Sequence, residues 1–153
     1  MSAAAGMDPR LLEELFAQIG GLHETLGLTF SVEGPGAITT RLPLTTRHLG
    51  SPLATHGGAV SAMMDTTLGM TALSYLVPQG RVCSTVEFKI NYLTPSRPGE
   101  LLLGHAQIDH AGRRLIIVSG TICEAASGRQ VARGIGTFNA YETDMDAWLQ
   151  TLA

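Results

Sequence analysis

The sequence predicts an α+β fold in which one curved antiparallel sheet wraps around a single long buried helix. Three observations lead to it. Residues 58–77 are apolar on nearly every side of a helix, the second half of the chain alternates as strands do, and two strand-like runs precede the helix. Packing that helix on one face of the sheet satisfies all three. A length of 153 residues fits a single domain, which we expect to span residues 1–153.

The first expected element is an N-terminal helix at about residues 8–19. Asp8 is suited to cap it, and Pro9 is suited to its first turn, where a missing N–H costs nothing. Apolar residues then recur at helical spacing. We expect Gly20-Gly21 to end the helix.

Two strands should follow this helix. Residues 28–33 alternate between apolar and polar side chains, and residues 37–42 can return antiparallel after the turn at 34–36. Residues 43–57 contain several prolines and glycines, so we expect mostly loop there.

The long central helix is expected at about residues 58–77 and should be buried on all sides, because its apolar residues point in nearly every direction. Pro78 and Gly80 terminate it. The remaining elements are four strands and a short terminal helix, at residues 82–92, 101–109, 115–124, 131–141 and 144–152.

Composition narrows the function classes. The net charge of −3 gives no electrostatic case for binding nucleic acid. No apolar run is long enough to span a membrane, and residues 1–7 lack the apolar core of a signal peptide, so we expect a cytoplasmic protein. The charged fraction of only 15% fits either a well-filled core or an apolar surface covered by another subunit. The cysteines, Cys83 and Cys123, are expected to be buried free thiols, with no metal and no cofactor.

A glycine turn directly precedes the central helix. His56-Gly57-Gly58 brings backbone N–H groups to a helix start, where they lack partners and carry partial positive charge. Such a corner can polarise a carbonyl and stabilise an oxyanion. The alternative is a tight turn that only starts the helix.

One carboxylate lies within the apolar helix. Asp65 would be costly to bury without a partner or a purpose. Ser61, Asp65 and Gly69 share one helix face, along which a cleft can open. The alternatives are a structural Asp65 bonded to a neighbouring hydroxyl, such as that of Ser61, and a close contact between helix and sheet at Gly69.

These residues resemble the signature of hotdog-fold thioesterases, most closely the PaaI-type branch named for phenylacetic acid degradation. Asp65 follows Gly58 by seven residues, and Gly69 comes four later. The run "TVEFKINYLTP" at residues 85–95 resembles the family's central strand and turn. The resemblance implies the hotdog fold, here with an extra N-terminal helix, and hydrolysis of acyl-CoA thioesters by a homodimer or homotetramer.

The resemblance also implies roles for individual residues. The Gly58 N–H, together with Gly57 in the turn that His56 begins, would bind the thioester carbonyl oxygen. Asp65 from the partner subunit would activate water or attack directly, and the Thr85 hydroxyl would help place the water. Coenzyme A would lie along the interface, with its phosphates near Arg97 and Arg113. Apart from the resemblance, Ser61 is expected to face the substrate because it shares the helix face of Asp65.

One position departs from the family pattern. Gly50 stands six residues before His56, where the family has Asn or Gln, and His48 is the expected replacement if the loop shifts. Two other functions stay open: a non-catalytic acyl-CoA-binding module, and a hydratase or dehydratase acting on acyl thioesters. The latter families use a His with an acid in proline-containing motifs, which the glycine turn does not resemble.

Overall fold

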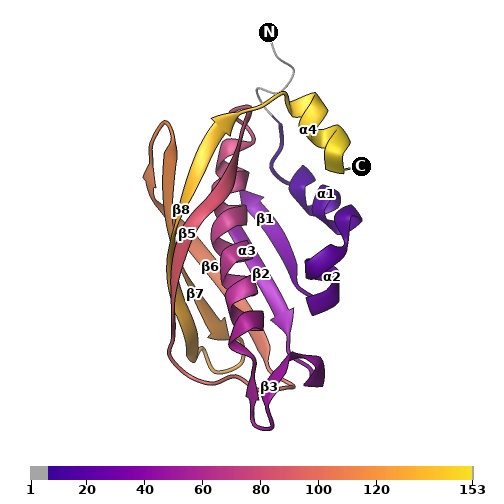
Figure 1. The fold of residues 1–153 in the computed structure, drawn as a ribbon, viewed down its shortest axis with the longest axis vertical. Helices are drawn as coiled ribbons and strands as arrows, with labels where there is room; N and C mark the ends of the chain where they lie inside the picture. Colours follow the sequence, from indigo (N-terminus) through magenta and orange to yellow (C-terminus); the bar gives the residue numbers. More distant parts are fainter. Residues whose placement is uncertain (1–6, 153) are drawn as a thin grey trace.

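The computed structural model describes residues 7–152 and shows a six-stranded antiparallel sheet curved around the helix α3 (Gly57–Leu76) (Figure 1). The strand order is β1-β2-β6-β7-β8-β5. The strands are β1 (Thr29–Gly34), β2 (Ala37–Pro43), β5 (Arg81–Tyr92), β6 (Leu101–Ala111), β7 (Leu115–Glu124) and β8 (Gln130–Glu142). The expected fold class is therefore confirmed. Residues 1–6, on which the signal-peptide argument mostly rests, lie outside the described residues.

Glycines in the sheet let α3 approach it closely. A Cβ at Gly120 on β7 would lie 3.0 Å from Leu68 Cδ2, and one at Gly136 on β8 would lie 3.2 Å from Leu68 Cδ1. A Cβ at Gly134 would lie 2.8 Å from Met64 Sδ. Both α3 side chains are completely buried. The bare strand positions therefore form the surface on which the helix packs, and a methyl group at any of them would push it away.

Three short helices pack beside α3, away from β6, β7 and β8 (Figure 1). They are α1 (Leu11–Ile19), α2 (Gly21–Leu26) and α4 (Met145–Leu152). Leu12 of α1 and Met145 of α4 are buried together in a second apolar cluster, which also holds Leu73 of α3. The two ends of the described chain thus cover part of the central helix.

The N-terminal helix ends at Ile19, before Gly20, as expected, but it begins later than expected. It begins at Leu11, because Asp8 accepts a 3.0 Å hydrogen bond from the Arg10 N–H in a turn before the helix and does not cap it. Gly20 then turns the chain with φ 64°, and Gly21 begins α2 where the sequence analysis expected the helical structure to stop.

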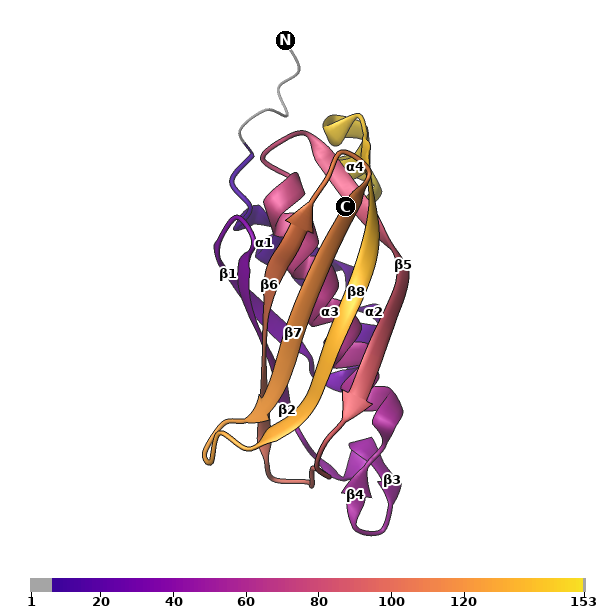
Figure 2. The same cartoon turned by 90° about the vertical axis from the view of Figure 1, so that its left-hand side faces the viewer.

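The segment before α3 is more ordered than a loop. It contains the 3-10 turn η1 (Thr46–His48) and a small hairpin of β3 (Leu49–Ser51) and β4 (Ala54–Thr55). Figure 2 shows this hairpin projecting beyond the end of the main sheet. It fixes the direction from which the chain enters α3.

The expectation that α3 is buried on all sides is wrong for one face. Met63, Met64, Leu68 and Ala72 are completely buried against the sheet. The opposite face is only half-buried and consists of Ser61, Ala62, Asp65, Thr66, Gly69 and Met70. We call these six residues the open face of α3. No helix of the described residues is both long and apolar enough to cross a membrane.

Candidate active site

In the glycine turn that starts α3, the backbone N–H of Gly58 is hydrogen-bonded and that of Gly57 is open. His56 is the N-cap, and its Nδ1 accepts a 2.7 Å hydrogen bond from the Gly58 N–H. A neutral ring therefore carries its proton on Nε2. Within the described residues the Gly57 N–H has no partner. The amide available to a ligand is thus that of Gly57, whereas the sequence analysis favoured that of Gly58.

Tyr92 supports this turn and was missed by the sequence analysis. Its hydroxyl donates a 3.0 Å hydrogen bond to the Gly57 carbonyl oxygen. Tyr92 ends β5, and only the path of the folded chain brings the end of that strand beside the start of α3. An aromatic residue at the end of an alternating strand carries no signal of such a role.

Asp65 is held by a hydroxyl from the sheet. Its Oδ1 accepts a 3.0 Å hydrogen bond from Thr85 Oγ1. Thr85 lies next to a bulge in the pairing of β5 with β8, and bulges re-aim neighbouring side chains. The Ser61 hydroxyl instead donates to the Gly58 carbonyl oxygen at 3.1 Å. The neighbouring hydroxyl that holds the Asp65 carboxylate is therefore that of Thr85 and not that of Ser61.

Asp65 and Thr85 border a cavity of about 380 Å³. We call it the main cavity. Its other lining residues come from α1, α2, α3, α4, β5 and β8, and they are Phe16, His23, Thr66, Gly69, Met70, Leu73, Cys83, Ser84, Phe138 and Trp148. A carboxylate fixed at the border of an apolar hollow is placed to act on a polar group whose apolar end fills the hollow.

Burial changes the titration of two lining residues. Burial raises the pKa of the Cys83 thiol to about 12, so that it stays protonated at neutral pH and is a poor nucleophile. Burial lowers the pKa of His23, which therefore favours the neutral ring. His23 Nε2 lies 3.1 Å from Thr66 Oγ1, within hydrogen-bond distance.

The open amide and the carboxylate are too far apart in one chain to act together. Gly57 and Asp65 are eight residues apart on α3, which places them about 12 Å apart along the helix axis. Groups that share one reacting carbonyl must each lie about 3 Å from it. A complete site of this kind therefore needs a second copy of the chain.

Strand β5 is an edge of the six-stranded sheet. It is a 12-residue strand paired on only one side, with β8. Ser84, Thr85, Val86 and Glu87 are exposed in succession, and the apolar Val86 is 58% exposed. Long unpaired edges readily pair with another strand.

His48 is not part of this site, which corrects the sequence analysis. The side chain is buried; its Nε2 lies 2.8 Å from the Leu26 carbonyl oxygen, and its Nδ1 accepts a 2.9 Å hydrogen bond from the Thr45 N–H. Both ring nitrogens of His48 are thus engaged by backbone groups and are not free to bind a substrate. Gly50 lies against His56, because a Cβ there would lie 2.7 Å from His56 Cα. The position leaves no room for the amide side chain of the family pattern.

Arg97 and Arg113 lie near opposite ends of β6, so one chain does not bring them together. Arg97 precedes the strand, and Arg113 follows it. The strand spans 11 residues, or about 35 Å. Arg113 instead lies beside Arg81 and Arg114 around a hollow of about 460 Å³. The two arginines can serve one ligand only across a subunit boundary.

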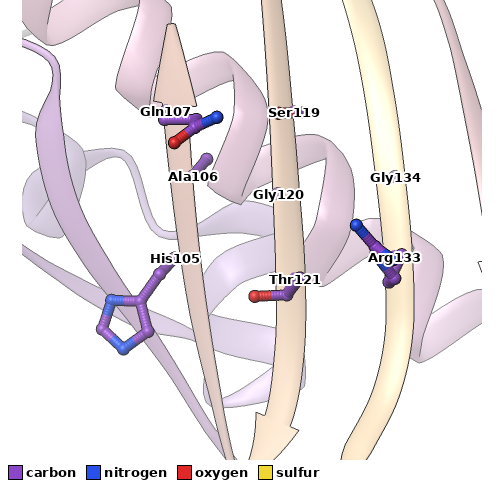
Figure 3. Close-up of a pocket in the computed structure, with 8 residues that line it drawn as sticks. All are labelled: His105, Ala106, Gln107, Ser119, Gly120, Thr121, Arg133 and Gly134. Carbon is purple, nitrogen blue, oxygen red and sulfur yellow. The ribbon is translucent and has the colours of Figure 1, made fainter.

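A further hollow of about 370 Å³ lies across β6, β7 and β8. Figure 3 shows His105, Gln107, Thr121 and Arg133 around it. None of the residues expected to take part in thioester hydrolysis lines it. Across residues 7–152, no group of three His, Cys, Asp or Glu side chains is placed to hold a metal ion.

Comparisons with known proteins show which family and fold the chain resembles. The family model described as "Thioesterase superfamily" matches residues 54–129, which include the glycine turn, Asp65 and Thr85. Human acyl-coenzyme A thioesterase 13 is 23% identical over 107 residues, covering 70% of this chain and 75% of the human protein.

Two solved structures are similar over most of the chain. The conserved protein PA5202 of Pseudomonas aeruginosa is 31% identical, with a TM-score of 0.73 over 82% of this chain and 98% of that protein. The PaaI protein from the phenylacetic acid degradation operon of Escherichia coli has a TM-score of 0.77 and 19% identity, over 87% of this chain and 94% of PaaI.

Proposed function

The chain belongs to the thioesterase superfamily, and we propose that it is an acyl-CoA thioesterase that hydrolyses a coenzyme A thioester to a free acid and coenzyme A. The observation that carries the proposal is the Asp65 carboxylate, held at 3.0 Å by Thr85 on the border of the main cavity. The human relative is named an acyl-coenzyme A thioesterase, which supports the same reaction. The proposed catalytic domain is a single one and spans residues 1–153.

The proposed enzyme is a homodimer joined through β5. Two β5 strands that pair antiparallel about a two-fold axis near Phe88 and Lys89 bring Tyr92 of one copy beside the partner's Thr85. Tyr92 holds Gly57, and Thr85 holds Asp65. The Gly57 amide of one subunit then faces the partner's Asp65, and each dimer has two such sites.

The chemistry follows from these two groups. The Gly57 N–H, at the positive end of α3, stabilises the charge that develops on the thioester carbonyl oxygen. Asp65 takes a proton from water as the water oxygen attacks the carbonyl carbon, or its carboxylate attacks directly and water then releases the acid. The carbon–sulfur bond breaks, and the leaving thiolate takes up a proton to give coenzyme A. Thr85 orients the carboxylate, and Ser61 and His56 shape the turn.

The phosphates of coenzyme A would bind to arginines at the interface. Arg113 lies with Arg81 and Arg114 near the start of β5, and Arg97 lies near the end of that strand. The antiparallel pairing brings the start of one β5 beside the end of the other. Arg113 of one subunit and the partner's Arg97 then approach the same end of the interface. Charge-assisted hydrogen bonds from Arg are well suited to phosphate oxygens.

The helix-free face of the sheet is the surface through which we propose that two dimers form a homotetramer. In Figure 2 no helix covers this face. Ile135 is 45% exposed on it, between Arg133 and Thr137. Sedimentation analysis would distinguish a dimer from a tetramer.

A panel of aryl- and alkyl-CoA thioesters with a thiol-release readout tests the proposed function. We expect steady release of coenzyme A from at least one class of thioester. Binding without release over hours would identify a non-catalytic module. A change in the double bond of an enoyl-CoA, without thiol release, would identify a hydratase. Either outcome would reject the proposed thioesterase activity.

A further inference from the structure

A second hollow adjoins the main cavity behind a wall of two side chains. It has a volume of about 370 Å³ and lies among α1, α2 and β1. Phe16 and His23 line both hollows, and among residues 7–152 no other residue is common to the two linings. They therefore separate the two spaces.

This wall consists of packed rings. The ring centroids of Phe16 and His23 lie 6.1 Å apart, and the Phe16 ring meets Phe30 edge-on at 5.9 Å. His23 lies 3.1 Å from the Thr66 hydroxyl on the open face of α3. Among the described residues these two rings are what the two linings share, so truncating one ring should join the two spaces.

The lining of the main cavity selects by charge. Phe16, Met70, Leu73, Phe138 and Trp148 make it largely apolar. No Lys or Arg is among the described residues that line it, and its one carboxylate is Asp65. A carboxylate on the acyl group would be a second negative charge beside Asp65. It would find no counterion there and would be costly to bury.

We propose that the acyl group of the substrate fills the main cavity, that it is uncharged and apolar, and that Phe16 and His23 limit its length. This inference rests on the proposed thioesterase function. The thioester carbonyl lies at the Asp65–Thr85 border, and the far end of the acyl chain meets the aromatic wall. With Phe16 truncated, a longer chain continues into the second hollow.

Two variants change the space in opposite directions. Phe16→Ala removes half of the wall. Gly69→Ala adds a methyl group on the open face, one turn beyond Asp65. A Cβ at Gly69 would lie 3.5 Å from Phe138 Cε1, which is an ordinary contact, so this variant reduces the space without a clash. Leu22→Ala is the matched control, because Leu22 is 62% exposed on α2 and lines neither hollow.

The test measures kcat/KM of wild type and variants on straight-chain acyl-CoA thioesters from butanoyl to tetradecanoyl, and on succinyl-CoA. We expect Phe16→Ala to raise the preference for long over short chains by about 10-fold or more, since each methylene in a fitted pocket is worth that much. Gly69→Ala should shift the preference toward short chains. Leu22→Ala should keep the wild-type profile, and succinyl-CoA should be a poor substrate throughout.

Other outcomes have distinct meanings. Suppose that wild type hydrolyses thioesters and both cavity variants keep its chain-length profile. The proposed limit on acyl length is then wrong, and the proposed thioesterase activity is unaffected. Rapid hydrolysis of succinyl-CoA would overturn the charge selection. If wild type hydrolyses neither these substrates nor aryl-CoA thioesters, the proposed function itself fails. Thermal melts identify a Phe16→Ala protein that has not folded, and Gly69→Ala then decides the question.

Discussion

The two faces of α3 differ in what they contact. The face toward the sheet is closed: Met64 and Leu68 have no exposed surface and lie over strand glycines. The open face is half-buried and carries Asp65, bonded to Thr85 beside the main cavity. One face of the helix thus holds the fold together, and the other carries the residues of the proposed active site. Substitutions on the closed face should change the free energy of unfolding, and substitutions on the open face should change turnover.

The largest effect is expected from Asp65→Asn on the open face. The amide keeps the shape and can still accept the Thr85 hydrogen bond, but it is a far weaker base or nucleophile. We expect kcat for thioester hydrolysis to fall by about 10²- to 10⁴-fold, the usual contribution of a positioned acid or base. Thiol release measures this loss, and a thermal melt close to wild type shows that the fold is kept. Near-normal hydrolysis would remove Asp65 from the mechanism.

Leu68→Ala on the closed face should have the converse effect. Truncating a completely buried leucine leaves a cavity and costs about 2–5 kcal/mol of unfolding free energy. Urea unfolding measures the cost, and kcat per folded molecule should stay near wild type. The division between the faces would break down if this variant lost turnover at unchanged stability.

A smaller effect is expected from Thr85→Val, which keeps the shape of the side chain and removes the hydroxyl that bonds Asp65. A hydrogen bond to a charged group is worth about 1.5–3 kcal/mol, so we expect kcat to fall by about 10-fold or more. Thr85→Ser keeps the hydroxyl and should retain most of the rate. If the Val and Ser variants had equal rates, the hydroxyl would have no part in positioning Asp65.

The smallest expected effect concerns pH and stability. Burial lowers the pKa of His23 in the folded protein below its value of about 6.5 in the unfolded chain. The unfolded state then binds more protons as pH falls through this range, so acid destabilises the fold. We expect the melting temperature to fall between pH 7.5 and 5.5, and to fall less in His23→Gln. Equal slopes for the two proteins would show that His23 does not contribute.

Most of the fold follows from the sequence because periodicity is a local property. The alternation in residues 82–92 and the all-round apolar pattern of residues 58–77 predicted β5 and α3 to within a residue or two. The helix α2 was missed because Gly20 and Gly21 normally end a helix, whereas here they redirect the chain into a second one. The open face of α3 was expected in part, because Ser61, Asp65 and Gly69 were placed on one helix face beside a cleft, whereas the all-round apolar pattern wrongly predicted burial on every side.

The site was partly predictable for a similar reason. The glycine turn and Asp65 stand out because their residue types are unusual at a helix start and inside an apolar helix. His56 bonding to Gly58, and Tyr92 bonding to Gly57, depend on tertiary geometry that no spacing encodes. His48 was assigned to the site only by its position in the chain. Its ring instead anchors the backbone at Leu26 and Thr45.

The central claim is that each active site combines the Gly57 amide of one subunit with the partner's Asp65. Subunit mixing tests it most directly. Gly57→Val and Asp65→Asn proteins, each shown to fold by thermal melting and each nearly inactive alone, are unfolded together and refolded as a mixture. A heterodimer of the two has one site with both groups intact. Random pairing should therefore restore about one quarter of wild-type thiol release in a two-fold dimer. A mixture with no more activity than its separate components would contradict the shared site.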